Sequence, residues 1–299
     1  MRIAIEINGS KSMKKVTNNP LIASFISNKY RDLILKPALK LLNRNQKTAQ
    51  CHFWTMPYDS ICQAIILNGF YERELLQGMC ALVKDKNGIA LDIGANIGNH
   101  SLFFSKHFDA VISFEPVPNN CLLLKANLFL NQIQNITLIE KALSNCNTKM
   151  GIDKGNSRNT NNTISQLDAN EINPMNQIMV DVVMGDAELA TLNLSQKIVL
   201  IKIDVEGHEP LVVEGLRKTI STHQPIVYWE AFCKDEAEKT KALLMEMGYS
   251  NFYHLTTKKY QSRLLNKLIK SLTNGAYLVE LDECTQFDGM NVASVERLM

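Results

Sequence analysis

Two glycines and an aspartate lie within one short segment, and their types and spacing are typical of a ligand-binding turn. Residues 89–98 read Ile-Ala-Leu-Asp-Ile-Gly-Ala-Asn-Ile-Gly, an apolar run that passes into a turn containing Gly94 and Gly98. Small residues let a ligand approach the backbone closely, and the amides of a helix that begins there can donate hydrogen bonds. The charge of Asp92 favours a cationic amino acid moiety and repels phosphates. The segment therefore predicts a ligand site, although the glycines could also form only a tight connection between a strand and a helix.

A second acid, Glu115, ends the next apolar run, about 20 residues further along the chain. An acid at this position of an α/β nucleotide site accepts hydrogen bonds from both ribose hydroxyls, although Glu115 could also be a solvated strand end. Together with Asp92 it predicts a site for an adenosine with a positively charged tail, and S-adenosylmethionine is such a ligand. The spacing Gly-x-x-x-Gly lacks the middle glycine of the dinucleotide fingerprint, which argues against a nicotinamide cofactor.

A third apolar run, 198–204, also ends in an acid and is followed by Val-Glu-Gly-His-Glu. Ligands of open parallel sheets bind beyond the carboxyl ends of the strands. We therefore expect Asp204, Glu206 and His208 to reach the same crevice as the two earlier acids. This crevice is the predicted active site.

Alternating apolar runs and helical patterns from residue 89 onward predict the frame that positions these side chains. Such alternation is typical of strand-helix-strand units and of an α/β fold with a mostly parallel sheet. The predicted strands are 89–93, 111–115, 137–140, 198–204, 226–229 and 252–255. The predicted helices are 72–83, 98–108, 119–130, 210–221 and 234–247. The polar, asparagine-rich interval 151–177 is predicted to be a mobile excursion over one edge of the domain.

These segments, in this order, resemble the FkbM family of S-adenosylmethionine-dependent methyltransferases. The resemblance is carried by Leu-Asp-Ile-Gly-Ala-Asn-Ile-Gly at 91–98, Phe-Glu-Pro at 114–116, Ala-Leu-Ser at 142–144 and Ile-Lys-Ile-Asp-Val-Glu-Gly-His-Glu at 201–209. It extends from about residue 69 to residue 230 and is looser at 251–253 and 291–296. It implies a Rossmann-like class I methyltransferase fold with helices on both faces of a mostly parallel seven-stranded sheet. The last strand would be antiparallel, near 292–296 or alternatively at 277–281.

The resemblance covers only part of the chain. Residues 1–68 have a loose helical pattern with a break at Pro37, and we expect them to form an N-terminal helical cap. Residues 69–299 are predicted to form the S-adenosylmethionine-binding methyltransferase domain. Where the family commonly has Thr-Leu-Asp-Asp before its fourth strand, residues 183–188 read Val-Met-Gly-Asp-Ala-Glu, which leaves the role of Asp186 open.

By motif position, the resemblance also implies which residues surround the S-adenosylmethionine cofactor. Those implied at its methionine part are Glu72, Asp92, Gly94, Ala95, Asn96 and Gly98. Those implied at the ribose and the adenine are Glu115, Pro116, Ala142 and Leu143. Asp204 is expected to contact either the cofactor or the acceptor.

The resemblance implies O-methylation of a hydroxyl on a saccharide, a glycolipid or a natural product. Such a transfer needs donor and acceptor in line and a base that removes the hydroxyl proton. The candidate catalytic residues are His208, Asp204 and Glu206. Each could instead be structural, with Asp204 bound to turn amides, Glu206 at a helix N-terminus and His208 exposed. No metal site is predicted, because an isolated acid pair is weak support for one.

Composition narrows the remaining function classes. The formal net charge of +2 provides no broad field for a nucleic acid partner, and no apolar stretch approaches the roughly 20 residues of a membrane-spanning helix. The seven cysteines contain no Cys-x-x-Cys pair, so a reducing cytoplasm fits best. The segment 258–272 has a basic amphipathic pattern that could rest on a membrane surface or pack its leucines on the domain. A non-catalytic cofactor-binding scaffold and a nicotinamide oxidoreductase remain alternatives, and the oligomeric state is not indicated.

Overall fold

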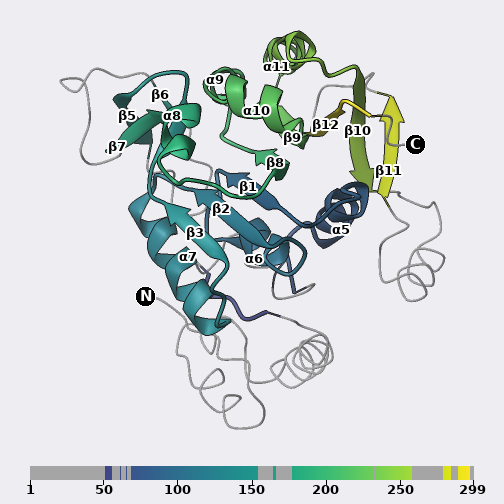
Figure 1. Cartoon of the computed structure of the whole chain (residues 1–299). Coiled ribbons are helices and arrows are strands. Elements are labelled where there is room, and N and C mark those ends of the chain that lie inside the picture. Colours follow the sequence, from purple (N-terminus) through teal and green to yellow (C-terminus); the bar gives the residue numbers. More distant parts are fainter. Residues whose placement is uncertain are drawn as a thin grey trace, which may run out of the picture.

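A computed structural model of the chain describes residues 51–55, 61, 65, 69–153, 164–165, 177–231, 233–257, 279–283 and 289–296. Its central sheet contains eight strands within these residues: β1 (Ile89–Ile93), β2 (Ala110–Phe114), β3 (Ile136–Ile139), β8 (Ile198–Ile203), β9 (Ile226–Ala231), β10 (Asn251–Thr257), β11 (Val279–Glu283) and β12 (Gly289–Ser294). Their order across the sheet is β11-β10-β12-β9-β8-β1-β2-β3 (Figure 1).

The pairing of these strands confirms the predicted class I methyltransferase fold. Neighbours from β3 to β9 pair in parallel, whereas β12 lies antiparallel between β9 and β10. The antiparallel strand therefore overlaps the first of its two predicted positions, 292–296. The alternative position, 277–281, overlaps β11, which pairs antiparallel with β10 and adds an eighth strand beyond the expected seven. An added strand of this kind satisfies the backbone groups along an edge that would otherwise be unpaired.

Helices cover both faces of this sheet, as expected (Figure 1). One face carries α5 (Arg73–Leu82), α6 (Asn99–Phe104) and α7 (Pro118–Leu130), and the other carries α9 (Glu209–Gly215), α10 (Arg217–His223) and α11 (Lys234–Glu246). Successive strand side chains point to opposite faces, so Ala90 packs with the first group and Leu91 with the second. The single helix predicted at 210–221 is two short helices that meet at Leu216.

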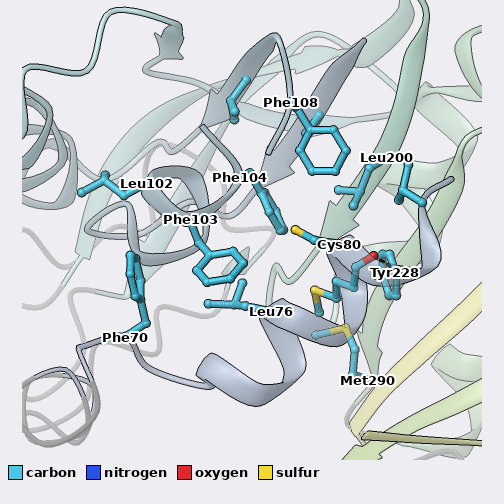
Figure 2. Close-up of a cluster of buried hydrophobic side chains, with 14 of the residues drawn as sticks. Phe70, Leu76, Cys80, Leu102, Phe103, Phe104, Phe108, Leu200, Tyr228 and Met290 are labelled. Carbon is cyan, nitrogen blue, oxygen red and sulfur yellow. Dashed lines mark hydrogen bonds between the residues drawn. The ribbon is translucent and has the colours of Figure 1, made fainter. Parts of the chain in front are cut away.

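The core beneath α5 and α6 anchors the segment that leads into the site. Figure 2 shows Leu76 and Cys80 of α5 among the phenylalanines of α6 and beside Leu200 and Tyr228 of the sheet. Leu76 is fully buried, and burial of such a side chain contributes about 1.5–3 kcal/mol. Tyr228 donates its hydroxyl hydrogen to the Met79 carbonyl oxygen at 2.9 Å. The helix α5 is thereby held against β9.

A second, four-stranded sheet lies beside the central one and was not predicted. It consists of β4 (Ala142–Ser144), β5 (Thr148–Asp153), β6 (Ile164–Ser165) and β7 (Gln177–Met184), in the order β4-β7-β5-β6. Apolar residues at every second position, Met150 with Ile152 and Val180 with Val182, form its buried face. The predicted excursion at 151–177 thus begins and ends in strands. Its other residues, apart from β6, lie outside the described part of the chain.

The described fragment of the predicted cap lies along α7. The side-chain amide of Asn131 accepts a hydrogen bond from the His52 N–H at 2.7 Å and donates one to the His52 carbonyl oxygen. Asn127 makes the same pair of bonds with the backbone of Trp54. The rest of the cap lies outside the described residues except for Ile61 and Ile65, and so does 258–272. None of the described helices is long and apolar enough to cross a membrane.

Candidate functional site

A cavity opens at the carboxyl ends of β1, β2, β8 and β9, with about 1180 Å³ of empty space that includes its opening to solvent. Most residues predicted from the sequence line it together. They are Glu72, Gly94, Ala95, Asn96, Glu115, Pro116, Ala142, Leu143, Asp204 and Glu206. The convergence follows from the topology, because the ends of parallel neighbouring strands meet at one edge of the sheet.

The glycine turn, residues 94–98, forms one wall of this cavity. Gly94 has φ 78°, and a Cβ added there would lie 1.8 Å from the Asp204 carbonyl oxygen. Only glycine fits this position, because the end of β8 crosses it at backbone distance. Gly98 also has a positive φ, but it packs near Leu124 and Leu102 and lies outside the cavity lining. Gly98 is the N-cap residue of α6 and so joins the glycine turn to that helix.

Glu115 is fixed by amide donors at the tip of β2. Its Oε2 accepts the Asn96 N–H at 2.8 Å, and its Oε1 accepts the Val117 N–H at 2.9 Å and the Asn120 side-chain amide at 3.3 Å. Burial raises the pKa of this carboxyl, whereas the three donors lower it. A carboxylate offers about four acceptor sites, so three donors leave capacity for a ligand hydroxyl. We call Glu115 and its three donors the amide-held side of the cavity.

Asp92 lies beneath the cavity and contacts a buried lysine. Its side chain is fully buried, accepts a hydrogen bond from Ser101 Oγ and lies outside the lining. Lys202 Nζ lies 3.3 Å from Asp92 Oδ1 and 3.4 Å from Asp204 Oδ2, and it donates to the Gly94 carbonyl oxygen at 3.1 Å. Burial opposes the lysine charge, but the two aspartates raise the pKa of Lys202 above its usual value. Asp92 therefore influences the glycine-turn wall of the cavity indirectly, through its ion pair with Lys202, which bonds to Gly94.

Lys202 has a structural importance that the sequence analysis did not assign. A lysine in the middle of the apolar run 198–204 is the signal, because a buried cation requires acidic partners. Alternation along the strands puts Lys202 on the same face of the sheet as Asp92, with which it is in register. The lysine thereby ties the end of β8 to the end of β1.

Four acids gather at the other end of the cavity, and we call Glu72, Asp204, Glu206 and Glu230 the carboxylate cluster. Burial and the neighbouring carboxylates raise the pKa of Glu206 to about 7 and that of Glu230 to about 8. Burial and Asp204 also raise the pKa of Glu72. Such mutual repulsion favours a cationic ligand at this end. Glu230 was not predicted, although an acid directly after the predicted strand 226–229 repeats the pattern of Asp204.

The structure separates the three predicted catalytic residues. Asp204 and Glu206 line the cavity, whereas His208 is buried outside the lining with its Nε2 2.9 Å from Ser144 Oγ. A different histidine, His100 of α6, lines the cavity. Burial lowers the pKa of His100 to about 4, so its imidazole is neutral at physiological pH.

Two further acids of the sequence motifs support the surrounding loops. Asp186 accepts hydrogen bonds from the backbone N–H groups of Lys218 and Thr219, each at 2.8 Å, and thus caps the start of α10. Glu209 accepts the Val205 N–H at 3.0 Å, inside the loop that carries Asp204 and Glu206. Within the described residues, no group of three His, Cys, Asp or Glu side chains is arranged to hold a metal ion.

Comparison with solved structures finds similar chains, and the three that follow are distant from this one in sequence. An FkbM methyltransferase from Methylobacillus flagellatus is 16% identical with a TM-score of 0.44, over 88% of this chain and 59% of that one. An S-adenosylmethionine-dependent O-methyltransferase from Thermotoga maritima is 9% identical with a TM-score of 0.43, over 80% and 72%. A precorrin-6y C5,15-methyltransferase from Geobacter metallireducens is 11% identical with a TM-score of 0.41, over 75% and 93%.

Comparison by sequence is more specific. No curated protein matches the chain significantly. The methyltransferase FkbM domain, however, matches residues 92–257, more than half of the 299 residues. This stretch begins at the aspartate before the glycine turn and includes the acids at the tips of β2, β8 and β9. The chain belongs to the FkbM methyltransferase domain family.

Proposed function

We propose that this protein is an S-adenosylmethionine-dependent methyltransferase that transfers a methyl group to a hydroxyl of a saccharide, glycolipid or natural product. The observation that carries the proposal is the composition of the cavity. An acid held by backbone amides stands at one end, and the carboxylate cluster stands at the other. This arrangement suits an adenosine whose tail is positively charged.

The residues present fit each part of S-adenosylmethionine. Glu115 retains acceptor capacity for ribose hydroxyls, and the neighbouring wall of Leu143 and Ile152 suits the apolar faces of an adenine. The carboxylate cluster compensates the sulfonium and ammonium charges. When bound, the cofactor supplies an electrophilic methyl group on its sulfonium.

The same cavity disfavours a nicotinamide dinucleotide, whose pyrophosphate is anionic. Two lysines line the cavity within the described residues, and both have acidic partners. Lys141 Nζ lies 2.8 Å from Glu188 Oε1, and Lys202 lies between two aspartates. Neither is available to neutralise a phosphate, and the carboxylate cluster would repel one.

The acceptor is proposed to be a hydroxyl compound without a negative charge near its reacting group. Carboxylates accept hydrogen bonds from hydroxyls, whereas an anionic group beside the carboxylate cluster would be repelled. The predicted cap, residues 1–68, is proposed to add to the acceptor wall, because its Ile61 lines the cavity. We propose the cytoplasm as the location, since the described cysteines 51, 80, 121, 146 and 233 are all free thiols.

Calorimetry and a labelled methyl donor test the proposal. The wild-type protein should bind S-adenosylmethionine and its product S-adenosylhomocysteine, and it should not bind NAD. Transfer of label to neutral glycosides or polyketide alcohols, and its absence with phosphorylated analogues, is the expected result. Binding without transfer to any acceptor class would favour the scaffold alternative. Binding of NAD in place of S-adenosylmethionine would falsify the proposed activity.

A further inference from the structure

Glu230 and Asp204 stand side by side at the tips of neighbouring strands. The register pairs Ile203 of β8 with Trp229 of β9, so the next residue of each strand lies at the same level. Neighbouring strands are about 4.8 Å apart, which brings the two carboxyl groups within reach of each other. They hydrogen-bond, and both line the cavity. Two carboxyl groups this close share a proton more readily than they both ionise.

Asp204 and Glu230 differ in the charged groups that surround them. Lys202 makes an ion pair with Asp204, so the charge of Asp204 has a buried counterion. Glu230 faces Asp204 and Lys202 from β8 and Glu72 and Tyr71 from the segment before α5. On its other side, β12 places Met290 opposite Glu230, and this residue carries no charge. Burial, Asp204 and Glu72 raise the pKa of Glu230 to about 8, so in the free protein it mostly retains its proton at pH 7.

An independent feature indicates that a ligand reaches this end of the cavity. The His100 side chain lines the cavity and is 7% exposed, yet its Nε2 has no hydrogen-bond partner among the described residues. Glu72 Oε2 is the nearby acid, at 3.8 Å, which is too long for a hydrogen bond. A buried polar atom without a partner is costly, and a ligand group can supply that partner.

We propose that Glu230 is the general base of the methyl transfer and that the cationic cofactor displaces its resting proton when it binds. This inference rests on the proposed function. A sulfonium charge within the carboxylate cluster favours ionised Glu230 and so produces the base only when the methyl donor is present.

The transfer step then balances in atoms and charge. The acceptor oxygen forms a bond to the methyl carbon while the bond between that carbon and sulfur breaks, and the breaking bond leaves its electron pair on sulfur. The hydroxyl proton passes to the Glu230 carboxylate. A sulfonium and a carboxylate precede the step, and a neutral thioether and a neutral carboxyl follow it. The net charge of the cavity is unchanged, which matters because separated charges are expensive in a poorly solvated site.

Proton release on cofactor binding tests this inference without any acceptor. Titration calorimetry at pH 7 in buffers of different ionisation enthalpy measures the protons released when S-adenosylmethionine binds. The wild-type protein should release up to about one proton, by the linkage between binding and a raised pKa. Glu230→Gln should still bind but release far less, whereas Glu214→Gln, a matched change at an exposed position outside the cavity, should behave as the wild type.

Several outcomes would overturn the inference and leave the proposed function intact. Binding without proton release by the wild type is one. Release that persists in Glu230→Gln but disappears in Glu206→Gln is another, because it would move the proton to Glu206. Failure of the wild type to bind S-adenosylmethionine would instead overturn the proposed function. If Glu230→Gln does not bind, Glu230→Asp keeps the carboxyl, and the inference then requires that it both bind and release a proton.

Turnover provides a second readout once an acceptor is found. Removal of a general base typically lowers kcat by about 10² to 10⁴. Glu230→Gln should show such a loss in kcat with little change in the KM for the cofactor. A pH profile of kcat/KM should lose its acidic limb in this variant, and an unchanged profile would contradict the assignment.

Discussion

The two ends of the cavity handle negative charge in opposite ways. On the amide-held side, the carboxylate of Glu115 is met by three N–H donors, and no other acid of the described residues raises its pKa. In the carboxylate cluster, four acids share one buried cation, Lys202, which is also paired with Asp92. The first arrangement fixes the Glu115 side chain in one position, and its three donors oppose the rise in pKa that burial causes. In the second arrangement, the protonation of the carboxyl groups depends on the charge of the ligand that enters the cavity.

In the proposed function, this difference assigns recognition of the cofactor to the amide-held side and proton transfer to the carboxylate cluster. Fixed donors suit the recognition of a ligand part that does not change during a reaction, such as a ribose. Raised pKa values suit groups that must gain and lose protons near neutral pH. The boundary between the two ends lies at Gly94, which approaches the backbone of Asp204 and receives a hydrogen bond from Lys202.

Lys202→Met removes the cation on which both ends depend. It would leave the fully buried Asp92 and the partly exposed Asp204 without their shared counterion, and breaking a buried pair such as Asp92–Lys202 costs about 3–5 kcal/mol. We expect a fall of that size in the free energy of unfolding, measured by urea denaturation. Lys84→Met is the matched control, because its 3.5 Å pair with Glu296 is largely exposed. An effect as small as in this control would show that the two ends do not depend on the lysine.

Glu115→Gln breaks the amide-held side alone. The amide keeps one acceptor oxygen but sets its NH2 group against either the Asn96 N–H or the Val117 N–H, and hydrogen bonds to charged groups contribute about 1.5–3 kcal/mol each. The affinity for S-adenosylmethionine, measured by calorimetry, should therefore fall by roughly 10- to 100-fold. Glu140→Gln, at an exposed ion pair with Lys125, should leave the affinity unchanged. Equal affinities would remove the assigned role of Glu115 at the ribose.

Gly94→Ala tests the boundary between the two ends. Both this glycine and Gly248 have a positive φ, but a Cβ at Gly248 would meet nothing within 4 Å. Gly248→Ala therefore measures the backbone strain alone. The clash at Gly94 should add about 1–3 kcal/mol, the usual cost of overpacking, to the loss of unfolding free energy. A difference near zero would mean that the ends of β1 and β8 separate easily.

Glu230→Gln sharpens the comparison from the side of the carboxylate cluster. The folded-state pKa of about 8 exceeds the unfolded value of about 4.5, so the folded state holds more protons between these pH values. Wild-type stability attributable to this group is therefore highest below pH 4.5 and falls as pH rises to about 8. The variant should lose this decline and be more stable than the wild type at pH 8.5, by about 1 kcal/mol after solvent screening of a half-buried group. Parallel pH curves of unfolding free energy would contradict this.

Much of this geometry could be predicted from local sequence, because buried strands are continuous apolar runs and their tips meet at one edge. This reasoning located Glu115 and Asp204, which line the cavity. It could not place the side chain of Asp92: the bounds of β1 were predicted correctly, but they do not tell which side chains of the strand face the ligand. Asp92 is the fourth of five residues in β1, and its side chain points into the layer beneath α6. That His100 and not the predicted His208 lines the cavity likewise depends on tertiary packing rather than on spacing.

The second sheet shows a different limit. Its strands alternate apolar and polar residues correctly, but they are short and stand beside an asparagine-rich stretch whose composition indicates a loop. Only the pairing of Thr148–Asp153 with Gln177–Met184, distant in sequence, reveals it. The role of Lys202 was missed for a related reason: a lysine inside an apolar run indicates buried acidic partners, but the sequence does not tell which acids these are.

Asn127 of α7 and Asn131, which caps the end of this helix, bind the backbone of residues 52 and 54 and not their side chains. Residue 52 should therefore tolerate replacement by most amino acids except proline, which has no N–H to donate. Trp54 also packs its side chain against the core that contains α5 and α6, so position 54 should accept only large apolar residues. Asn127 and Asn131 should tolerate almost no replacement, because aspartate lacks the donor and leucine lacks both groups. Among natural variants of this protein, we therefore expect Asn127 and Asn131 to be constant while the residue at position 52 varies.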